Sequence, residues 1–464
     1  MTSLLQLEPR EIEDGLRSGK IIVSVVGLGH IGLPLAVVLA NSGAHVIGVD
    51  VDRTKIDALR AGVPTMYEPG LEQAFKSIIG TRLEVSGDLA RAVSHASVIV
   101  ICVGTPADRT GKPSLTQVKE SCGIIADNLQ EGTVVIVRST VPPGTTGTLV
   151  RRILEERTRM KMGVDFGLLY CPERLAGARA MTEIISVPHI VAGFDEKSVS
   201  AGRAIFHFVG GETVIPESVE VAEMAKLFDN VYRHVNIALA NELGLICEAF
   251  GVDMLQVLKA CNTGPRTRIM LPGAAIGGSC LTKDPRALTR LAKERGVTLK
   301  LIPAGTTVDR HILDHAVGLV LSAYKQLGRR VAGSRIAVFG LAYKGDTDDL
   351  RATAARPIVN MLRKRKASVH AYDPYVQPQD VAKTFGELRV MRDPIEAARD
   401  ADCILVMANH STLKSISLQE LAQVARMPAA FVDAVQAFEP GEVLSVGFVY
   451  RGVGRVMTRP KTTT

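Results

Sequence analysis

The chain contains 464 residues, of which 46% are hydrophobic and 22% charged, and its formal net charge at pH 7 is +7. These values indicate a globular protein of two to four domains, each large enough to bury a core. The longest apolar runs, such as residues 96–103, have strand length, far below the ~20 residues of a membrane-spanning helix. Residues 1–20 mix acids and bases without an apolar signal core, so we expect a cytoplasmic location.

The seven cysteines are scattered and form no CxxC pair. This spacing argues against a zinc site and a disulfide framework, and we expect no bound metal. Basic residues are also spread out, apart from the run Arg363–Lys366, which falls where a helix is expected to end. Since aromatic interleaving and nucleic-acid motifs are missing, the positive charge is compatible with an anionic small substrate. We expect neither nucleic acid nor a membrane as a partner.

A strand, a glycine turn, a helix and a second strand follow the N-terminal segment. Residues 21–26 are an apolar run of strand length, and the sequence Gly-x-Gly-x-x-Gly at residues 27–32 follows directly. The next strand, residues 45–49, ends at Asp50. In this context the glycines predict close approach of the backbone to a pyrophosphate, and Asp50 predicts binding of ribose hydroxyls. An ordinary strand–turn–helix is the alternative. The carboxylate favours NAD over NADP, although Arg53 lies nearby.

Three further strands in this half end next to polar residues. The strands at residues 97–103 and 133–137 lead into turns that contain Thr105 and Thr140, and a strand at residues 166–170 precedes Glu173. Ligands of open parallel sheets bind beyond the carboxyl ends of the strands, so these turns are candidates for ligand contacts. Well-formed turns without a ligand are the alternative for each one taken alone.

A helix of more than thirty residues is predicted between residues 217 and 250, where apolar residues recur at helical spacing and proline is absent. Its length of about 50 Å exceeds what one domain requires, and such helices usually cross between domains or subunits. Lys226, Asn230 and Arg233 share one face of it. An amide and an ammonium group on one face suit an oxyanion, whereas a solvated charged face is the alternative.

The most informative segment is Gly-Gly-Ser-Cys-Leu-Thr-Lys-Asp at residues 277–284. The glycine pair permits close approach of another molecule, and a thiol, an amine and a carboxylate follow within a few residues. A nearby cation favours ionisation of Cys280, and an acid can handle water or protons. Combined with the dinucleotide motif, this group predicts an oxidation through a covalent thioester. Asp284 precedes Pro285, and the structural alternative for Asp284 is the N-cap of a helix over residues 286–295.

The alternation of strands and helices restarts near residue 333. Strands are predicted at residues 335–339, 368–372 and 403–407, and a helix at 353–365. The first turn, residues 340–345, lacks the glycine pattern that a pyrophosphate requires. We interpret this half as a pseudo-repeat that binds something other than a dinucleotide. The predicted fold class is α/β, with two doubly wound Rossmann-like domains joined by a long central helix.

These motifs, in this order, resemble the UDP-glucose/GDP-mannose dehydrogenase family over nearly the whole chain, from residue 21 to a final strand near Val432. The Gly-Gly-Ser-Cys-x-x-Lys-Asp element is highly specific. Within the family the chain is most similar to the branch that acts on UDP-N-acetylhexosamines. Three segments carry that similarity: Pro-Glu-Arg at residues 172–174, residues 226–243, and Pro-Arg at 265–266 followed by Leu-Pro-Gly at 271–273.

The resemblance implies NAD as cofactor, a UDP-sugar as substrate and a homodimer or a higher even oligomer. It also implies an order of domains along the chain. These would be an N-terminal extension (1–20), an NAD-binding Rossmann domain (21–214), a helical dimerisation domain that carries the catalytic cysteine (215–328) and a UDP-sugar-binding domain (329–464).

The resemblance further implies a role for each site residue. Cys280 would be the nucleophile, Lys226 the oxyanion or acid–base lysine, and Asn230 would orient the substrate. Asp284 would position water, and Glu173 would act as base in thioester hydrolysis. The cofactor would contact Gly27, Gly29, His30, Ile31, Gly32, Asp50, Lys55, Thr105, Thr140 and Arg351. The substrate would contact Arg174, Leu175, Lys226, Asn230, Arg233, Arg266, Gly277 and Lys344, with Arg266 reaching across a dimer.

The chain departs from the branch pattern at two places. Residues 433–436 read Asp-Ala-Val-Gln, where Asp-x-Arg-Asn is usual and its arginine meets the UDP, and Thr282 stands where proline or an aliphatic residue is usual. The expected activity is the NAD-dependent twofold oxidation of C6 of UDP-N-acetylmannosamine or UDP-N-acetylglucosamine to the uronic acid, through a thiohemiacetal and a thioester on Cys280. A UDP-glucose 6-dehydrogenase is the alternative within this class. A non-catalytic nucleotide-sugar sensor is the alternative from another class.

Overall fold

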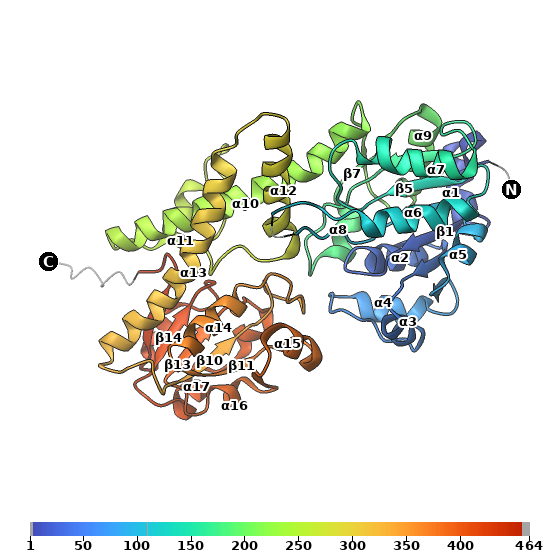
Figure 1. The fold of residues 1–464 in the computed structure, drawn as a ribbon. Coiled ribbons are helices and arrows are strands. Elements are labelled where there is room, and N and C mark those ends of the chain that lie inside the picture. The colour runs from blue at the N-terminus through green and yellow to red at the C-terminus, as the bar shows by residue number, and fades with distance from the viewer. Residues whose placement is uncertain (1–2, 109, 457–464) are drawn as a thin grey trace. The chain divides into compact units, whose positions relative to one another are not determined.

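The computed structural model describes residues 3–108 and 110–456 (Figure 1). The chain divides into two compact units, Met1–Asp229 and Asn230–Thr464. The boundary falls inside one helix, α10 (Val219–Phe250), whose 32 residues confirm the long helix predicted from the sequence. The predicted N-terminal extension (1–20) and the predicted UDP-sugar-binding domain (329–464) therefore extend beyond the described residues, at positions 1–2 and 457–464.

The first unit is built on a mainly parallel sheet. Its described strands follow the order β3-β2-β1-β4-β5-β6-β8, in which β8 is antiparallel to β6. From β3 to β6 this is the strand order of dinucleotide-binding domains, so the predicted doubly wound domain is confirmed. The strands are β1 (Ile22–Val26), β2 (His45–Val49), β3 (Leu83–Ser86), β4 (Val98–Ile101), β5 (Val134–Val137), β6 (Gly167–Tyr170) and β8 (Ala192–Gly193), with β7 (His189–Ile190) and β9 (Thr213–Val214) paired separately.

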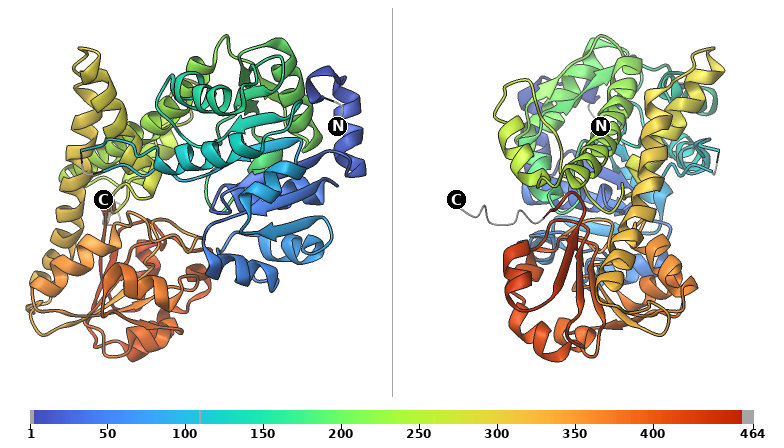
Figure 2. Two further views of the ribbon diagram at one scale, coloured as in Figure 1. Left: turned by 45° about the vertical axis from the view of Figure 1, so that its right-hand side comes forward. Right: turned by 90° about the vertical axis from the view of Figure 1, so that its left-hand side faces the viewer.

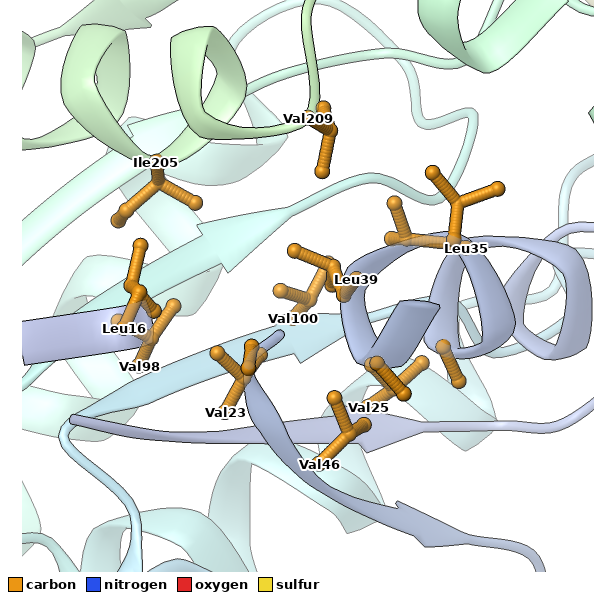
Figure 3. Close-up of a cluster of buried hydrophobic side chains, with 14 of the residues drawn as sticks. Leu16, Val23, Val25, Leu35, Leu39, Val46, Val98, Val100, Ile205 and Val209 are labelled. Atoms are coloured by element: carbon orange, nitrogen blue, oxygen red, sulfur yellow. The ribbon is translucent and has the colours of Figure 1, made fainter. Parts of the chain in front are cut away.

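Helices cover both faces of this sheet, which is why its strands read as continuous apolar runs. Figure 3 shows side chains such as Leu16, Leu39 and Ile205 gathered over Val23 and Val100 on one face. The helices are α1 (Pro9–Ser18), α2 (Gly32–Asn41), α3 (Arg53–Arg60), α4 (Leu71–Ile78), α5 (Leu89–His95), α6 (Thr116–Asn128), α7 (Arg151–Thr158), α8 (Ala180–Ser186) and α9 (Glu196–Phe208). A short 3₁₀ helix lies at Leu4–Gln6 and a short π-helix at Thr146–Val150. The N-terminal segment joins this core, because α1 packs on α9.

The second unit contains a parallel sheet with the same connectivity. Among the described residues its strands follow the order β12-β11-β10-β13-β14-β15. This order reproduces β3 to β6 of the first unit, which confirms the predicted pseudo-repeat. The strands are β10 (Arg335–Phe339), β11 (Ser368–Tyr372), β12 (Arg389–Met391), β13 (Cys403–Val406), β14 (Ala430–Asp433) and β15 (Val449–Gly452). The prediction that the final strand lies near Val432 was wrong, because β15 follows it.

Helices of the second unit also pack on both faces of its sheet, seen from two directions in Figure 2. α13 contacts α12 as well as α14, β14 and β15, so it joins the helical layer to the sheet. The helices are α11 (Met254–Cys261), α12 (Ser279–Glu294), α13 (Leu301–Gln326), α14 (Ala355–Lys364), α15 (Pro378–Phe385), α16 (Pro394–Ala398), α17 (Leu418–Val424) and α18 (Pro440–Ser445), with a short turn at Ser411–Ser415. In the part of the chain that the structure describes, every helix is too short or too polar to cross a membrane.

Candidate active site

The β1–α2 turn contains the three predicted glycines, and each has a different reason to be glycine. Gly27 has a φ of 95°, and a Cβ added there would lie 3.0 Å from the Cys102 carbonyl oxygen. A Cβ on Gly32 would lie 1.8 Å from the carbonyl oxygen of Gly27, whereas a Cβ on Gly29 meets no atom within 4 Å. Two glycines therefore permit the tight turn, and the third leaves the backbone open. This arrangement fits a pyrophosphate above the start of α2, with His30 and Ile31 completing the turn.

Asp50 lies at the carboxyl end of β2, where a cofactor ribose is expected. Its carboxylate accepts hydrogen bonds from Leu28 N (2.9 Å) and Asp52 N (3.1 Å), and Lys55 Nζ lies 2.8 Å from Oδ2. Burial acts to raise the pKa of Asp50, but Lys55 and the backbone donors outweigh burial and lower it. The group is therefore a fixed anion at neutral pH, and Lys55 is held beside it.

The two turns after β4 and β5 meet within the first unit. The hydroxyl of Thr105 donates to the carbonyl oxygen of Thr140 at 2.6 Å. The second turn is also anchored to α10, because the Glu223 carboxylate accepts from Gly144 N (2.5 Å), Thr146 N (2.9 Å) and the Thr146 hydroxyl (2.7 Å). Both turns thus lie together at the carboxyl edge of the sheet, where a cofactor is expected.

Lys226 and Glu173 form a buried ion pair. Lys226 on α10 is 1% exposed, and its Nζ lies 3.0 Å from Glu173 Oε1, while Leu175 N donates to Glu173 Oε2 at 2.8 Å. Burial acts to raise the pKa of Glu173, but the charge of Lys226 outweighs burial and lowers it. A solvated charged face on α10, the structural alternative for Lys226, is therefore wrong. Arg174 follows Glu173 and is half-buried.

In the second unit, Asn230 connects α10 to α12. Its amide nitrogen donates to Asp284 Oδ2 at 2.6 Å, and its amide oxygen accepts from Arg233 Nη2 at 2.5 Å. Asn230 and Asp284 are both 0% exposed, and Lys283 Nζ lies 2.8 Å from Asp284 Oδ1. Asp284 is thus a buried carboxylate held between an amide and an ammonium group, which suits a role in placing a water molecule.

Asp284 is not a helix N-cap. The sequence favoured a helix that begins after it, but α12 begins at Ser279, with Gly278 as its N-cap at φ 84°, and Asp284 and Pro285 lie inside the helix. Cys280 therefore occupies the first turn, where the partial positive charge of a helix N-terminus favours a thiolate. Burial raises the pKa of three other thiols to about 12, namely Cys102, Cys122 and Cys171.

The glycine pair before Cys280 accommodates a side chain of the same unit. A Cβ on Gly277 would lie 2.8 Å from Tyr343 Cβ, and one on Gly278 would lie 2.9 Å from its ring. The structure places Tyr343, from the turn after β10, against both glycines, and the predicted approach of another molecule here stays a prediction. The adjacent Lys344 lies over the Tyr343 ring, 6.0 Å from its centroid.

Arg351, between β10 and α14 of the second unit, forms a bidentate ion pair with Asp349. Its Nη2 lies 2.7 Å from Asp349 Oδ2, and its Nε lies 2.9 Å from Oδ1. Burial acts to lower the pKa of Arg351, but Asp349 outweighs burial and raises it, with Cys280 as a further anionic contributor. The predicted role of Arg351 in cofactor binding stays a prediction.

In the pseudo-repeat, Asp373 stands at the position that Asp50 has in the first unit, and protein groups bind its carboxylate. Asp373 at the end of β11 accepts from Leu341 N at 2.7 Å, as Asp50 accepts from Leu28 N. His410 Nε2 lies 3.1 Å from Asp373 Oδ2, and both side chains are fully buried. This pair explains physically why the second Rossmann-like domain does not repeat the cofactor site.

Other predicted residues lie outside these clusters. Arg266 is exposed on the loop between α11 and α12. The atypical segment after β14 is tied to the end of β15, because Gln436 Nε2 donates to the Val453 carbonyl oxygen at 2.9 Å. Sequence reasoning did not identify Glu223, Tyr343 or Asp349. Glu223 had one available signal, its position three residues before Lys226 on one face of α10.

Comparison with known proteins supports this assembly of motifs. Three domains of the UDP-glucose/GDP-mannose dehydrogenase family match in order: the NAD binding domain at residues 21–209, the central domain at 220–311 and the UDP binding domain at 337–440. A UDP-N-acetyl-D-mannosamine dehydrogenase of Pyrococcus horikoshii is 34% identical over 93% of this chain and 99% of its own. The UDP-glucose 6-dehydrogenase TuaD of Bacillus subtilis is 30% identical over 94% of each chain.

A solved structure is similar to this chain over most of its length. The UDP-D-ManNAc dehydrogenase of Pyrococcus horikoshii superposes with a TM-score of 0.83 at 32% identity, covering 94% of this chain and 99% of the other. The match includes the domain that binds NAD and the domain that binds UDP, so the predicted cofactor is confirmed. The chain therefore belongs to the UDP-glucose/GDP-mannose dehydrogenase family and is an NAD-dependent dehydrogenase of nucleotide sugars.

Proposed function

We propose that this protein oxidises C6 of a UDP-N-acetylhexosamine from the primary alcohol to the carboxylate, with Cys280 as a covalent nucleophile. The observation that carries the proposal is the position of Cys280 in the first turn of α12, one turn before the buried Asp284. α10 carries Lys226 and Asn230 four residues apart on one helix face, and Asn230 binds Asp284. The similarity to UDP-N-acetyl-D-mannosamine dehydrogenases supports the substrate class.

The chemistry divides between these side chains. Bound NAD⁺ supplies the acceptor for the two hydrides that leave C6, one NAD⁺ for each. Lys226, paired with Glu173, stabilises negative charge on the C6 oxygen as the hydroxyl proton leaves. The Cys280 thiolate adds to the aldehyde carbon, which gives a thiohemiacetal, and loss of the second hydride leaves a thioester. Covalent capture retains the reactive aldehyde in one site.

Hydrolysis completes the reaction. Asp284 holds a water molecule, Glu173 accepts its proton, and hydroxide attack on the thioester carbon breaks the C–S bond and restores the thiol. The balance is one alcohol, two NAD⁺ and one water giving one carboxylate, two NADH and three protons. Arg174, Leu175, Arg233, Arg266, Gly277 and Lys344 are proposed to bind the sugar nucleotide.

The substrate class is tested by a panel of nucleotide sugars compared by kcat/KM. An N-acetyl carbonyl needs a donor, and Arg174, Arg233 or Arg266 can supply one. A site built around that bond discriminates against substrates that leave the donor unpaired. We expect UDP-N-acetylmannosamine or UDP-N-acetylglucosamine to exceed UDP-glucose and GDP-mannose by about 10²-fold or more. If UDP-glucose is the best substrate, the substrate class is wrong although the chemistry stands.

Cofactor preference gives a second test. We expect NAD⁺ to exceed NADP⁺ by about 10²-fold in kcat/KM, because Asp50 repels a 2′-phosphate. Asp50→Ser removes that charge and frees the neighbouring Lys55 ammonium, so the preference should fall by at least about tenfold. Asp52→Ser is the matched control, since serine also caps α3. Equal use of both cofactors by the unaltered protein would show that Arg53 governs the pocket.

We also propose that the protein is a homodimer through α10. Tyr232, Leu239 and Ile246 recur every seven residues along this helix and are 54%, 45% and 53% exposed. An exposed apolar stripe of this spacing suits the same helix of a second copy. The family resemblance implies that the helical domain at residues 215–328 dimerises. A cytoplasmic location stays a prediction from the sequence.

A further inference from the structure

The helix that carries Cys280 contains a proline where its hydrogen-bond ladder would normally continue. Pro285 lies inside α12 (Ser279–Glu294) and has no N–H. In an α-helix the residue at position 285 would donate to the carbonyl of residue 281. The Leu281 carbonyl, directly after the nucleophile, therefore lacks its helical donor.

A side chain from α10 replaces that donor. His234 Nδ1 lies 3.0 Å from the Leu281 carbonyl oxygen, and Thr306 of α13 places its hydroxyl 3.3 Å from His234 Nε2. Because a carbonyl only accepts, Nδ1 carries the proton, and Nε2 accepts from the Thr306 hydroxyl. His234 is 3% exposed, and burial lowers its pKa, so the imidazole is neutral.

Close packing fixes the ring in this place. A Cβ added to Gly305 of α13 would lie 3.3 Å from Cδ2 and Nε2 of His234, so the small residue leaves room for the imidazole. His234 also follows Asn230 by one turn on α10, and Asn230 donates to Asp284 at 2.6 Å. Two successive turns of α10 thus hold the N-terminal turns of α12 through separate hydrogen bonds.

We infer that His234 is a positioning residue for Cys280: its Nδ1–H replaces the helical donor that Pro285 removes and thereby fixes the turn that carries the thiol. The inference rests on the proposed role of Cys280. Without the imidazole, the carbonyl of the half-buried Leu281 loses its protein donor, and the first turns of α12 can rearrange to find another one. Displacement of a reacting group by about 1 Å costs about 10²-fold in rate.

The test compares variants that keep or remove a donor at the Nδ1 position. His234→Leu removes the donor and should lower kcat by about 10–100-fold, with KM within about twofold of the original value. His234→Asn keeps an amide N–H close to that position and should stay within about threefold. His315→Leu is the matched control: His315 lies on α13 and binds Glu248 of α10 at 3.0 Å, away from Leu281, so kcat should not change.

Pro285→Ala provides the decisive variant. Alanine restores a backbone N–H to the Leu281 carbonyl, so His234 becomes dispensable. In this background, His234→Leu should lower kcat by less than about threefold, and the double-mutant cycle should show strong coupling between the two positions. The double variant also keeps the test valid if His234→Leu alone folds poorly.

The rate of alkylation of Cys280 relative to Cys261 distinguishes a local effect on the thiol from general destabilisation of the protein. Alkylation by iodoacetamide is followed by peptide mass spectrometry as a function of pH, with the exposed Cys261 as internal reference. We expect His234→Leu to shift the pH profile at Cys280 and to leave Cys261 unchanged. A lower Tm with unchanged kcat and an unchanged Cys280 profile would overturn the inference, as would additive effects in the cycle. Full activity of Cys280→Ser would instead overturn the proposed function.

Discussion

Replacement of Cys280 by alanine is expected to stop uronate formation, with a loss in kcat of about 10⁴-fold or more. In the proposed mechanism the second oxidation starts from a covalent thiohemiacetal, and Cys280 is the thiol placed at a helix N-terminus. Alanine is a strong helix former, so α12 should remain intact. The measurement is chromatography of the sugar nucleotides after prolonged incubation with NAD⁺.

Cys261→Ala is the matched control for this prediction, because Cys261 is an exposed thiol at the end of α11. Its kcat should stay within about twofold of the original value. Uronate formation by Cys280→Ala at a rate within tenfold of the unaltered protein would move the nucleophile to another residue.

Asp284→Asn is expected to trap the thioester. Asparagine keeps an oxygen that accepts from Asn230 but removes the carboxylate that places water, so hydrolysis should slow by about 10²–10⁴-fold. Mixing with NAD⁺ and substrate should then give a burst of NADH, followed by slow turnover. Mass spectrometry should find the Cys280 peptide heavier by the acyl sugar nucleotide.

The double variant Cys280→Ala/Asp284→Asn is the control and should form no adduct. Normal turnover with a lower Tm in Asp284→Asn would show that Asp284 has a structural role only. An adduct that persists in the double variant would place the covalent bond on another side chain.

The inner strands of both larger sheets were predictable because parallel strands buried on two faces form unbroken apolar runs, as in β4 and β5. The four edge strands, β3, β8, β12 and β15, were missed. β15, for example, reads Val-Tyr-Arg-Gly and mixes apolar and charged residues. The glycine motif and Asp50 were identifiable because turn, helix start and carboxylate occur at fixed sequence spacing.

The site was less predictable where partners are distant in sequence. Glu173 and Lys226 are 53 residues apart, and neither segment indicates the other locally. Asp284 was open to interpretation as an N-cap because Asp-Pro is a common helix start. In the structure α12 nevertheless begins at Ser279, and His234 on another helix lies 3.0 Å from the Leu281 carbonyl oxygen. Tertiary contacts therefore override the local signal.

If the proposed four-electron oxidation is completed in one site, each sugar consumed yields two NADH, and this ratio can be measured. The unaltered protein is incubated with limiting UDP-N-acetylmannosamine and excess NAD⁺, NADH is read by absorbance, and the sugar nucleotides are separated by chromatography. We expect two NADH for each uronate formed, with no free aldehyde at any time. A ratio of one, with the 6-aldehyde in solution, would contradict it.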